Sequence, residues 1–128
     1  MRGVLDTSVF IAGEQRRPLA VERLPDEAAI SVLTLAALEL GVHMATSDDV
    51  RARRLATLRA LHATYVALPV DETVASSFAE LVAAARRAGR GLKVQDAWIA
   101  ATARAHGAAV YTQDAGFDGV PGLDVVRV

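Results

Sequence analysis

The chain has 128 residues, of which 52% are hydrophobic, and its formal net charge at pH 7 is −1. This length suits one domain with a real core, no apolar run approaches the roughly 20 residues that span a bilayer, and the absence of cysteine excludes disulfides and thiolate metal sites. Acidic and basic residues nearly balance, so charge alone indicates no nucleic-acid partner, and we expect a cytoplasmic location with no membrane segment.

Short apolar runs alternate with helical patterns through the first half of the chain. The run 4–5 is typical of a short buried strand, and Asp6-Thr7-Ser8 supplies helix-capping side chains directly after it. The predicted elements, in order, are a strand at 4–5, a helix through 9–12, an ambiguous segment at 19–27, a strand at 28–31 and helices at 33–45 and 49–63.

The same alternation continues in the second half. The predicted elements there are a strand at 65–68, a helix at 71–89, a helix at 95–106, a strand at 109–111 and a last strand at 123–128. Strands that alternate with helices imply an α/β fold with a central, mostly parallel sheet flanked by helices. Ligands of such sheets bind beyond the carboxyl ends of the strands.

Four acidic residues lie where folding has least need of a charge. Asp6 follows the first strand, Asp114 follows the apolar run 109–113, and Asp96 opens the helix that leads into that run. Glu39 lies beside the apolar stripe of the helix at 33–45. Carboxylates in apolar surroundings are costly without a positive partner. If the four converge, a hard cation such as Mg²⁺ or Mn²⁺ is the partner that fits.

Each acid also has a purely structural interpretation. Asp6 fits a helix cap, Asp96 a first-turn acid favoured by the helix dipole, and Asp114 a turn residue. Glu39 is the hardest to explain in this way, because a partly buried carboxylate without a partner would be destabilising. Two basic clusters allow both phosphate contact and simple solvation; they are Arg51, Arg53, Arg54 and Arg59, and Arg86, Arg87, Arg90 and Lys93.

Two other α/β enzyme classes with acids at strand ends fit less well. A receiver-type phosphoacceptor domain needs an Asp after the third strand, where Leu68-Pro69-Val70 intervenes before Asp71. A haloacid-dehalogenase-like phosphatase needs a second Asp at the position of Ser8. The sequence therefore disfavours both classes.

The ordered set of motifs resembles the PIN-domain family. The resemblance rests on 5–11 (LDTSVFI), on 31–41 with Glu39-Leu40 before Gly41, on 96–103 (DAWIAATA), and on Thr112-Gln113-Asp114 with the closing 121–125 (PGLDV). It covers nearly the whole chain, so we expect one PIN-like nuclease domain over residues 1–128. Trp98 and Gln113 depart from the usual pattern, but neither is part of the acidic quartet.

The resemblance implies a Mg²⁺- or Mn²⁺-dependent ribonuclease with Asp6, Glu39, Asp96 and Asp114 as its catalytic residues. Asp6 and Asp96 would be the metal ligands. Asp114 would join them directly or through water, and Glu39 would orient a water. The hydroxyls of Ser8 and Thr112 would fix carboxylate geometry.

In its small size, the chain most closely resembles the VapC-type toxins of bacterial toxin–antitoxin pairs. The expected partners are therefore an RNA substrate, a second copy of the chain in a homodimer, and a small antitoxin. The antitoxin peptide would fill an apolar groove near the acids and insert an Arg or Lys among them. The alternative is a catalytically silent PIN-like scaffold that binds RNA or a partner protein.

Overall fold

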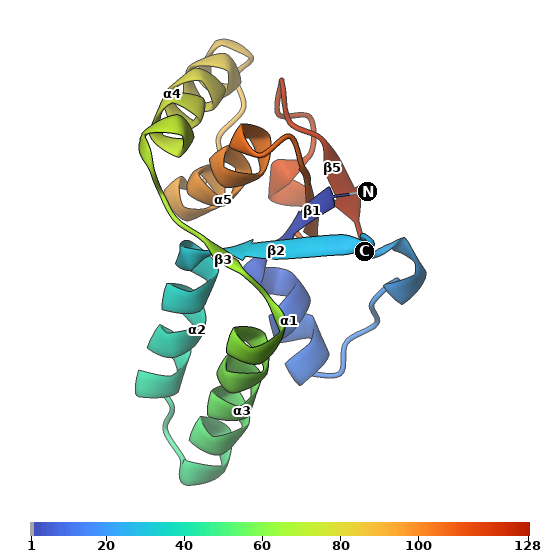
Figure 1. Ribbon diagram of the computed structural model, residues 1–128, viewed down its shortest axis with the longest axis vertical. Helices are drawn as coiled ribbons and strands as arrows, with labels where there is room; N and C mark the ends of the chain where they lie inside the picture. The colour runs from blue at the N-terminus through green and yellow to red at the C-terminus, as the bar shows by residue number, and fades with distance from the viewer. Residues whose placement is uncertain (1) are drawn as a thin grey trace.

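The computed structural model describes residues 2–128, and its centre is one sheet of five strands, all parallel (Figure 1). The strands are β1 (Arg2–Leu5), β2 (Glu27–Ser31), β3 (Ala67–Leu68), β4 (Ala109–Thr112) and β5 (Val125–Arg127). They lie in the order β3-β2-β1-β4-β5. The predicted α/β class with a mostly parallel sheet is therefore confirmed.

In the described part of the chain, five α-helices and two short 3₁₀ turns connect the strands. They are α1 (Thr7–Glu14), η1 (Val21–Arg23), α2 (Val32–His43), α3 (Asp48–Thr64), α4 (Glu72–Arg87), α5 (Val94–Ala105) and η2 (Ala115–Phe117). Side-chain caps explain several starts: Ser31 accepts from the N–H of Leu33, and Asp71 accepts from the N–H of Val74. Within the described residues, no helix combines the length and the apolarity needed to cross a membrane.

Several predicted elements have different bounds in the structure. The segment 19–27 forms only the short turn η1, and its last residue already belongs to β2. The predicted strand 65–68 is shortened to Ala67–Leu68, because the N–H of Tyr65 still donates to the carbonyl oxygen of Leu61 at the end of α3 and Pro69 ends the pairing. The last strand covers 125–127 rather than 123–128.

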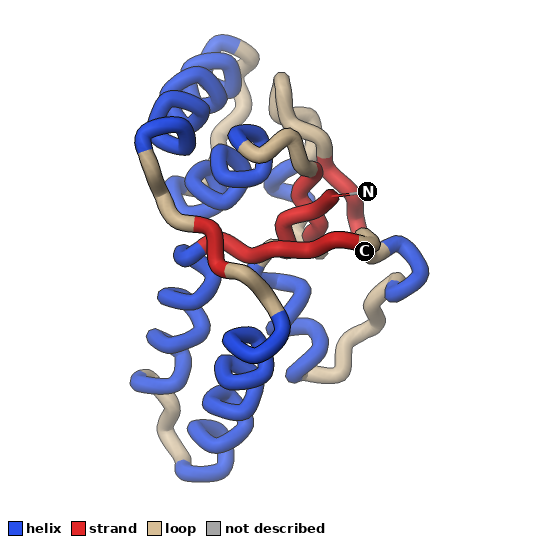
Figure 2. Tube along the Cα trace, viewed as in Figure 1, coloured by secondary structure: helices blue, strands red, loops and turns tan. Residues whose placement is uncertain are grey.

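Helices cover both faces of the sheet, so the core has two parts (Figure 2). Val4 and Val110 pack with Leu81 and Ile99 on the side of α4 and α5. The residues that follow them, Leu5 and Tyr111, face the opposite way, as alternate residues of a strand must. They pack with residues of β2, α2 and α3 in the second part of the core.

The order of the strands changes direction at β1, the central strand of the sheet. From β1 the chain adds β2 and β3 on one side, and it then returns to place β4 and β5 on the other. Leu5 pairs with Tyr111, so the carboxyl ends of β1 and β4 lie next to each other. A reversal of this kind opens a crevice beyond the strand ends, where ligands of parallel sheets bind.

Gly3 shows how tightly β1 packs. A Cβ at this position would overlap the ring of Tyr111 and lie 2.8 Å from Cγ of Pro25. We expect Gly3→Ala to lower the free energy of unfolding by about 1–3 kcal/mol, as overpacking of a filled core does.

Gly13 of α1 is the matched control, because a Cβ there meets no atom within 4 Å. Gly13→Ala should leave stability unchanged or raise it by about 0.5–1 kcal/mol. Urea unfolding of both variants measures the difference. Equal stabilities for the two would contradict this account of β1 packing.

Candidate active site

Asp6 stands directly after β1 and is the buried anchor of the site, with only 4% of its surface exposed. Its Oδ2 accepts hydrogen bonds from the hydroxyls of Ser8 at 2.7 Å and Thr112 at 2.9 Å. Oδ2 also accepts a longer bond of 3.4 Å from the N–H of Ser8, so Asp6 caps α1 as well. The prediction that Ser8 and Thr112 fix this carboxylate is confirmed.

The same hydroxyls connect Asp6 to the segment that carries Asp114. The hydroxyls of Ser8 and Thr112 lie 3.1 Å apart. Thr112 Oγ1 accepts from the N–H of Asp114 at 2.9 Å, and Ser8 Oγ accepts from the N–H of Gln113 at 3.0 Å. The carboxyl ends of β1 and β4 are therefore joined by a network of side chains and backbone amides.

Asp114 is half-buried at the start of η2. Its Oδ1 accepts from the N–H of Gly116 at 2.8 Å, so the residue also serves the turn that the sequence suggested. The Asp114 carboxylate thus closes a turn.

Asp96 brings the third carboxylate to this place from the first turn of α5. Burial, followed by the negative charges of Asp6 and Asp114, raises the pKa of Asp96 from 3.8 to about 6, while Lys93 acts in the opposite direction. Carboxylates must be close to influence one another in this way. Asp6, Asp96 and Asp114 therefore form one electrostatic group, which we call the acidic triad.

The structure does not bring Glu39 into this group. Its side chain is exposed on α2, and it is absent from the charges that raise the pKa of Asp96. The expectation of a partly buried Glu39 was wrong because the buried face of α2 is centred on Thr34 and Leu38. The next residue after Leu38 points about 100° away from it.

One residue of α2, Thr34, contacts the segment that follows Asp6. The hydroxyl of Thr7 donates to Oγ1 of Thr34 at 3.1 Å, and Thr34 is fully buried. Thr34 was not among the predicted site residues. The overlooked signal was a hydroxyl within an otherwise apolar stretch, Val32 to Leu38.

The acidic triad suits a cation that keeps much of its water. Among the described residues, no three His, Cys, Asp or Glu side chains are gathered closely enough to form a ready-made metal cage. Mg²⁺ is typically held by one or two carboxylates and several waters, so such a cage is not required. Every hydrogen bond to the Asp6 carboxylate goes to Oδ2, and no ion pair neutralises it within the described chain. The donor set therefore fits Mg²⁺ or Mn²⁺.

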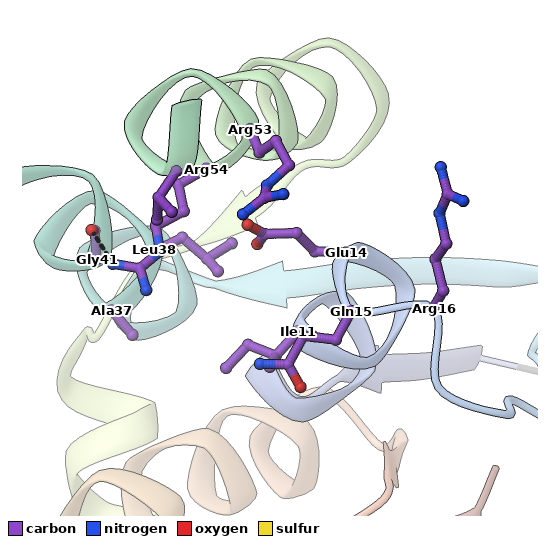
Figure 3. Close-up of a pocket in the computed structure, with 10 residues that line it drawn as sticks. Ile11, Glu14, Gln15, Arg16, Ala37, Leu38, Gly41, Arg53 and Arg54 are labelled. Carbon is purple, nitrogen blue, oxygen red and sulfur yellow. Dashed lines mark hydrogen bonds between the residues drawn. The ribbon is translucent and has the colours of Figure 1, made fainter. Parts of the chain in front are cut away.

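A pocket of about 730 Å³ lies between α1, α2 and α3 (Figure 3). Its lining includes the apolar side chains of Ile11, Leu38 and Val50. Glu14 of α1 and Arg53 of α3 point toward one another across it. The pocket thus combines an apolar floor with charges of both signs.

Known proteins resemble this chain over its whole length. A family model described as PIN domain matches residues 3–123. Ribonuclease VapC5 of Mycobacterium tuberculosis is 44% identical over 129 residues, which cover 98% of this chain and 95% of that protein. Ribonuclease VapC4 of the same organism is 39% identical over 127 residues, covering 99% and 97%.

Solved structures give the same result. VapBC-5 of Mycobacterium tuberculosis, a member of the VapBC family of toxin–antitoxin systems, matches with a TM-score of 0.89 and 42% identity over 99% of this chain and 98% of that one. DNA-bound VapBC of Salmonella typhimurium matches with a TM-score of 0.84 at 24% identity, covering 99% and 98%, which supports the fold alone. The chain belongs to the PIN-domain family, and within it the proteins described above place it beside the VapC group.

The raised pKa of Asp96 predicts how stability depends on pH. Between pH 3.8 and about 6 the folded state retains a proton that the unfolded chain has lost. The stability associated with this proton is present at low pH and is lost as pH rises through about 6. In EDTA, Asp96→Asn should therefore melt above wild type at pH 7.5, and the difference should shrink toward pH 4. The same difference at both pH values would contradict the crowding of the acidic triad.

Proposed function

We propose that this protein is a divalent-metal-dependent endoribonuclease and the toxin of a type II toxin–antitoxin pair, acting in the cytoplasm. The observation that carries the proposal is the buried Asp6 carboxylate, held by two hydroxyls beside the charges of Asp96 and Asp114. The names of the VapC relatives support ribonuclease activity. No observation favours the alternative of a catalytically silent scaffold.

In this proposal each acid has a separate task. Asp6 and Asp96 hold Mg²⁺ or Mn²⁺, and Asp114 joins them directly or through a water. When bound, such a cation stabilises charge on the phosphate and lowers the pKa of an attacking water. Ser8 and Thr112 keep Oδ2 of Asp6 occupied, which directs Oδ1 to the ligand. Glu39, which we predicted to orient a water, is exposed on α2 and outside the acidic triad, so we propose no direct contact between it and the cation.

The antitoxin is proposed to bind the pocket between α1, α2 and α3. Solved relatives are described as toxin–antitoxin complexes, which supports a partner of this kind. A peptide with apolar side chains would cover Ile11, Leu38 and Val50, and charged side chains would pair with Glu14 and Arg53. Because Asp6 caps the N-terminus of α1, an Arg or Lys of such a peptide has a route along this helix toward the acidic triad. We also propose that the protein is a homodimer.

Activity measurements separate the acids by their tasks. Antitoxin-free protein should cut RNA with Mg²⁺ or Mn²⁺ and stop in EDTA. Asp6→Asn and Asp96→Asn should each lose at least about 100-fold in kcat/KM, because each removes a direct ligand charge. Glu39→Gln is the matched control and should stay within about 2-fold of wild type. Full cleavage in EDTA would rule out the metal mechanism. A large loss of kcat/KM in Glu39→Gln would show that Glu39 takes part in catalysis.

A variant of Thr112 tests whether its hydroxyl supports the Asp6 carboxylate. Thr112→Val preserves shape but removes the donor to Asp6, so cation affinity and kcat should fall by roughly 10–100-fold. Thr64→Val changes an exposed hydroxyl at the end of α3 and should have no such effect. Cleavage rates measured across a Mn²⁺ titration compare the two variants. An unchanged Mn²⁺ dependence in Thr112→Val would show that the Thr112 hydroxyl does not support cation binding.

A further inference from the structure

The loop that carries Asp114 has little regular structure of its own. Between β4 and β5 it forms only the turn η2, and Asp118 and Gly119 immediately after η2 are exposed. A carboxylate on such a loop is positioned only as well as the loop is held. The contacts that hold the loop therefore matter for the acidic triad.

Arg127 of β5 holds the loop from one side. Its guanidinium donates to the carbonyl oxygen of Gln113 at 2.8 Å and to Oδ2 of Asp118 at 3.2 Å. These two acceptors lie on either side of Asp114 in the sequence. The Gln113 side chain adds bonds to the carbonyls of Pro18 and Val128.

Arg90 holds the loop from a different segment of the chain. It belongs to the link between α4 and α5, the segment that leads directly to Asp96. Its guanidinium donates to the carbonyl oxygen of Asp118. It also lies against Gly119, which has φ of +71°, and a Cβ on Gly119 would lie 3.3 Å from Nη2 of Arg90. Glycine at this position allows both the backbone conformation and the close approach.

We infer that Arg90 is a positioning residue that fixes the separation of the Asp96 and Asp114 carboxylates by tying the α4–α5 link to the turn after η2. The contact joins the two segments that deliver these acids, whereas the Asp6 carboxylate is held by Ser8 and Thr112 without any contact to Arg90. A guanidinium has a rigid array of donors, which makes it suited to such a tie. This inference rests on the proposed metal-dependent ribonuclease activity.

Three variants test the inference. Arg90→Gln removes the contact. Gly119→Ala keeps the guanidinium charge but crowds the contact. Arg87→Gln is the matched control, because Arg87 is an exposed neighbour that makes no side-chain hydrogen bond or ion pair within the described residues. Two quantities are measured for each variant: the Kd of Mn²⁺ for the RNA-free protein by calorimetry, and kcat and KM on a fluorogenic RNA.

We expect Arg90→Gln and Gly119→Ala to weaken Mn²⁺ binding several-fold and to lower kcat by about 10-fold or more. A small displacement of a catalytic group is enough to lower the reaction rate by such a factor. KM should remain near the wild-type value, and Arg87→Gln should match wild type throughout. Melting temperatures accompany each measurement.

Three results would overturn the inference while leaving the proposed function intact. One is a rise in KM alone in Arg90→Gln, which would make Arg90 an RNA contact. The second is a lower melting temperature with unchanged Kd and kcat, which would make the tie purely structural. The third is no change at all. A wild-type protein that neither binds Mn²⁺ nor cuts RNA would instead defeat the proposed function, and the inference with it.

Discussion

The bond from the Thr112 hydroxyl to the Asp6 carboxylate is the interaction on which the rest of the site depends. It joins the ends of β1 and β4, and the same hydroxyl oxygen accepts the N–H of Asp114. A buried carboxylate without hydrogen bonds would be strongly destabilising. The bonds from Ser8 and Thr112 offset part of that cost, and they leave Oδ1 available to a ligand. The packing of β1 against β4 and the proposed cation site therefore both involve the Asp6 carboxylate.

Much of this arrangement was predictable from the sequence. Alternating strands and helices require parallel pairing, and parallel strands bring their carboxyl ends to one edge. Asp6 and Asp114 follow two strands directly, so their convergence needed only that β1 and β4 be neighbours. The full order β3-β2-β1-β4-β5 was not predictable, because it depends on pairing between segments far apart in the chain.

The placement of Glu39 failed for a physical reason. Helix α2 carries apolar residues on nearly every side, and Leu40 and Met44 remain 60% and 68% exposed. An amphipathic stripe reveals a buried face only when the opposite face is polar. Contacts with α3 and β2, rather than local pattern, decide which face of α2 turns inward. Arg90 was predicted only as a member of a basic cluster, and its contact could not be foreseen because its partner carbonyl lies 28 positions further along the chain.

The central claim is that Asp6 and Asp96 share one cation at the carboxyl edge of the sheet, with Asp114 beside it. Anomalous diffraction from a crystal of the antitoxin-free protein soaked in Mn²⁺ tests this most directly. The account predicts one strong peak roughly 2.1 Å from carboxylate oxygens of both Asp6 and Asp96. A peak bound elsewhere, or an empty edge in crystals of protein that cuts RNA with Mn²⁺, would contradict it.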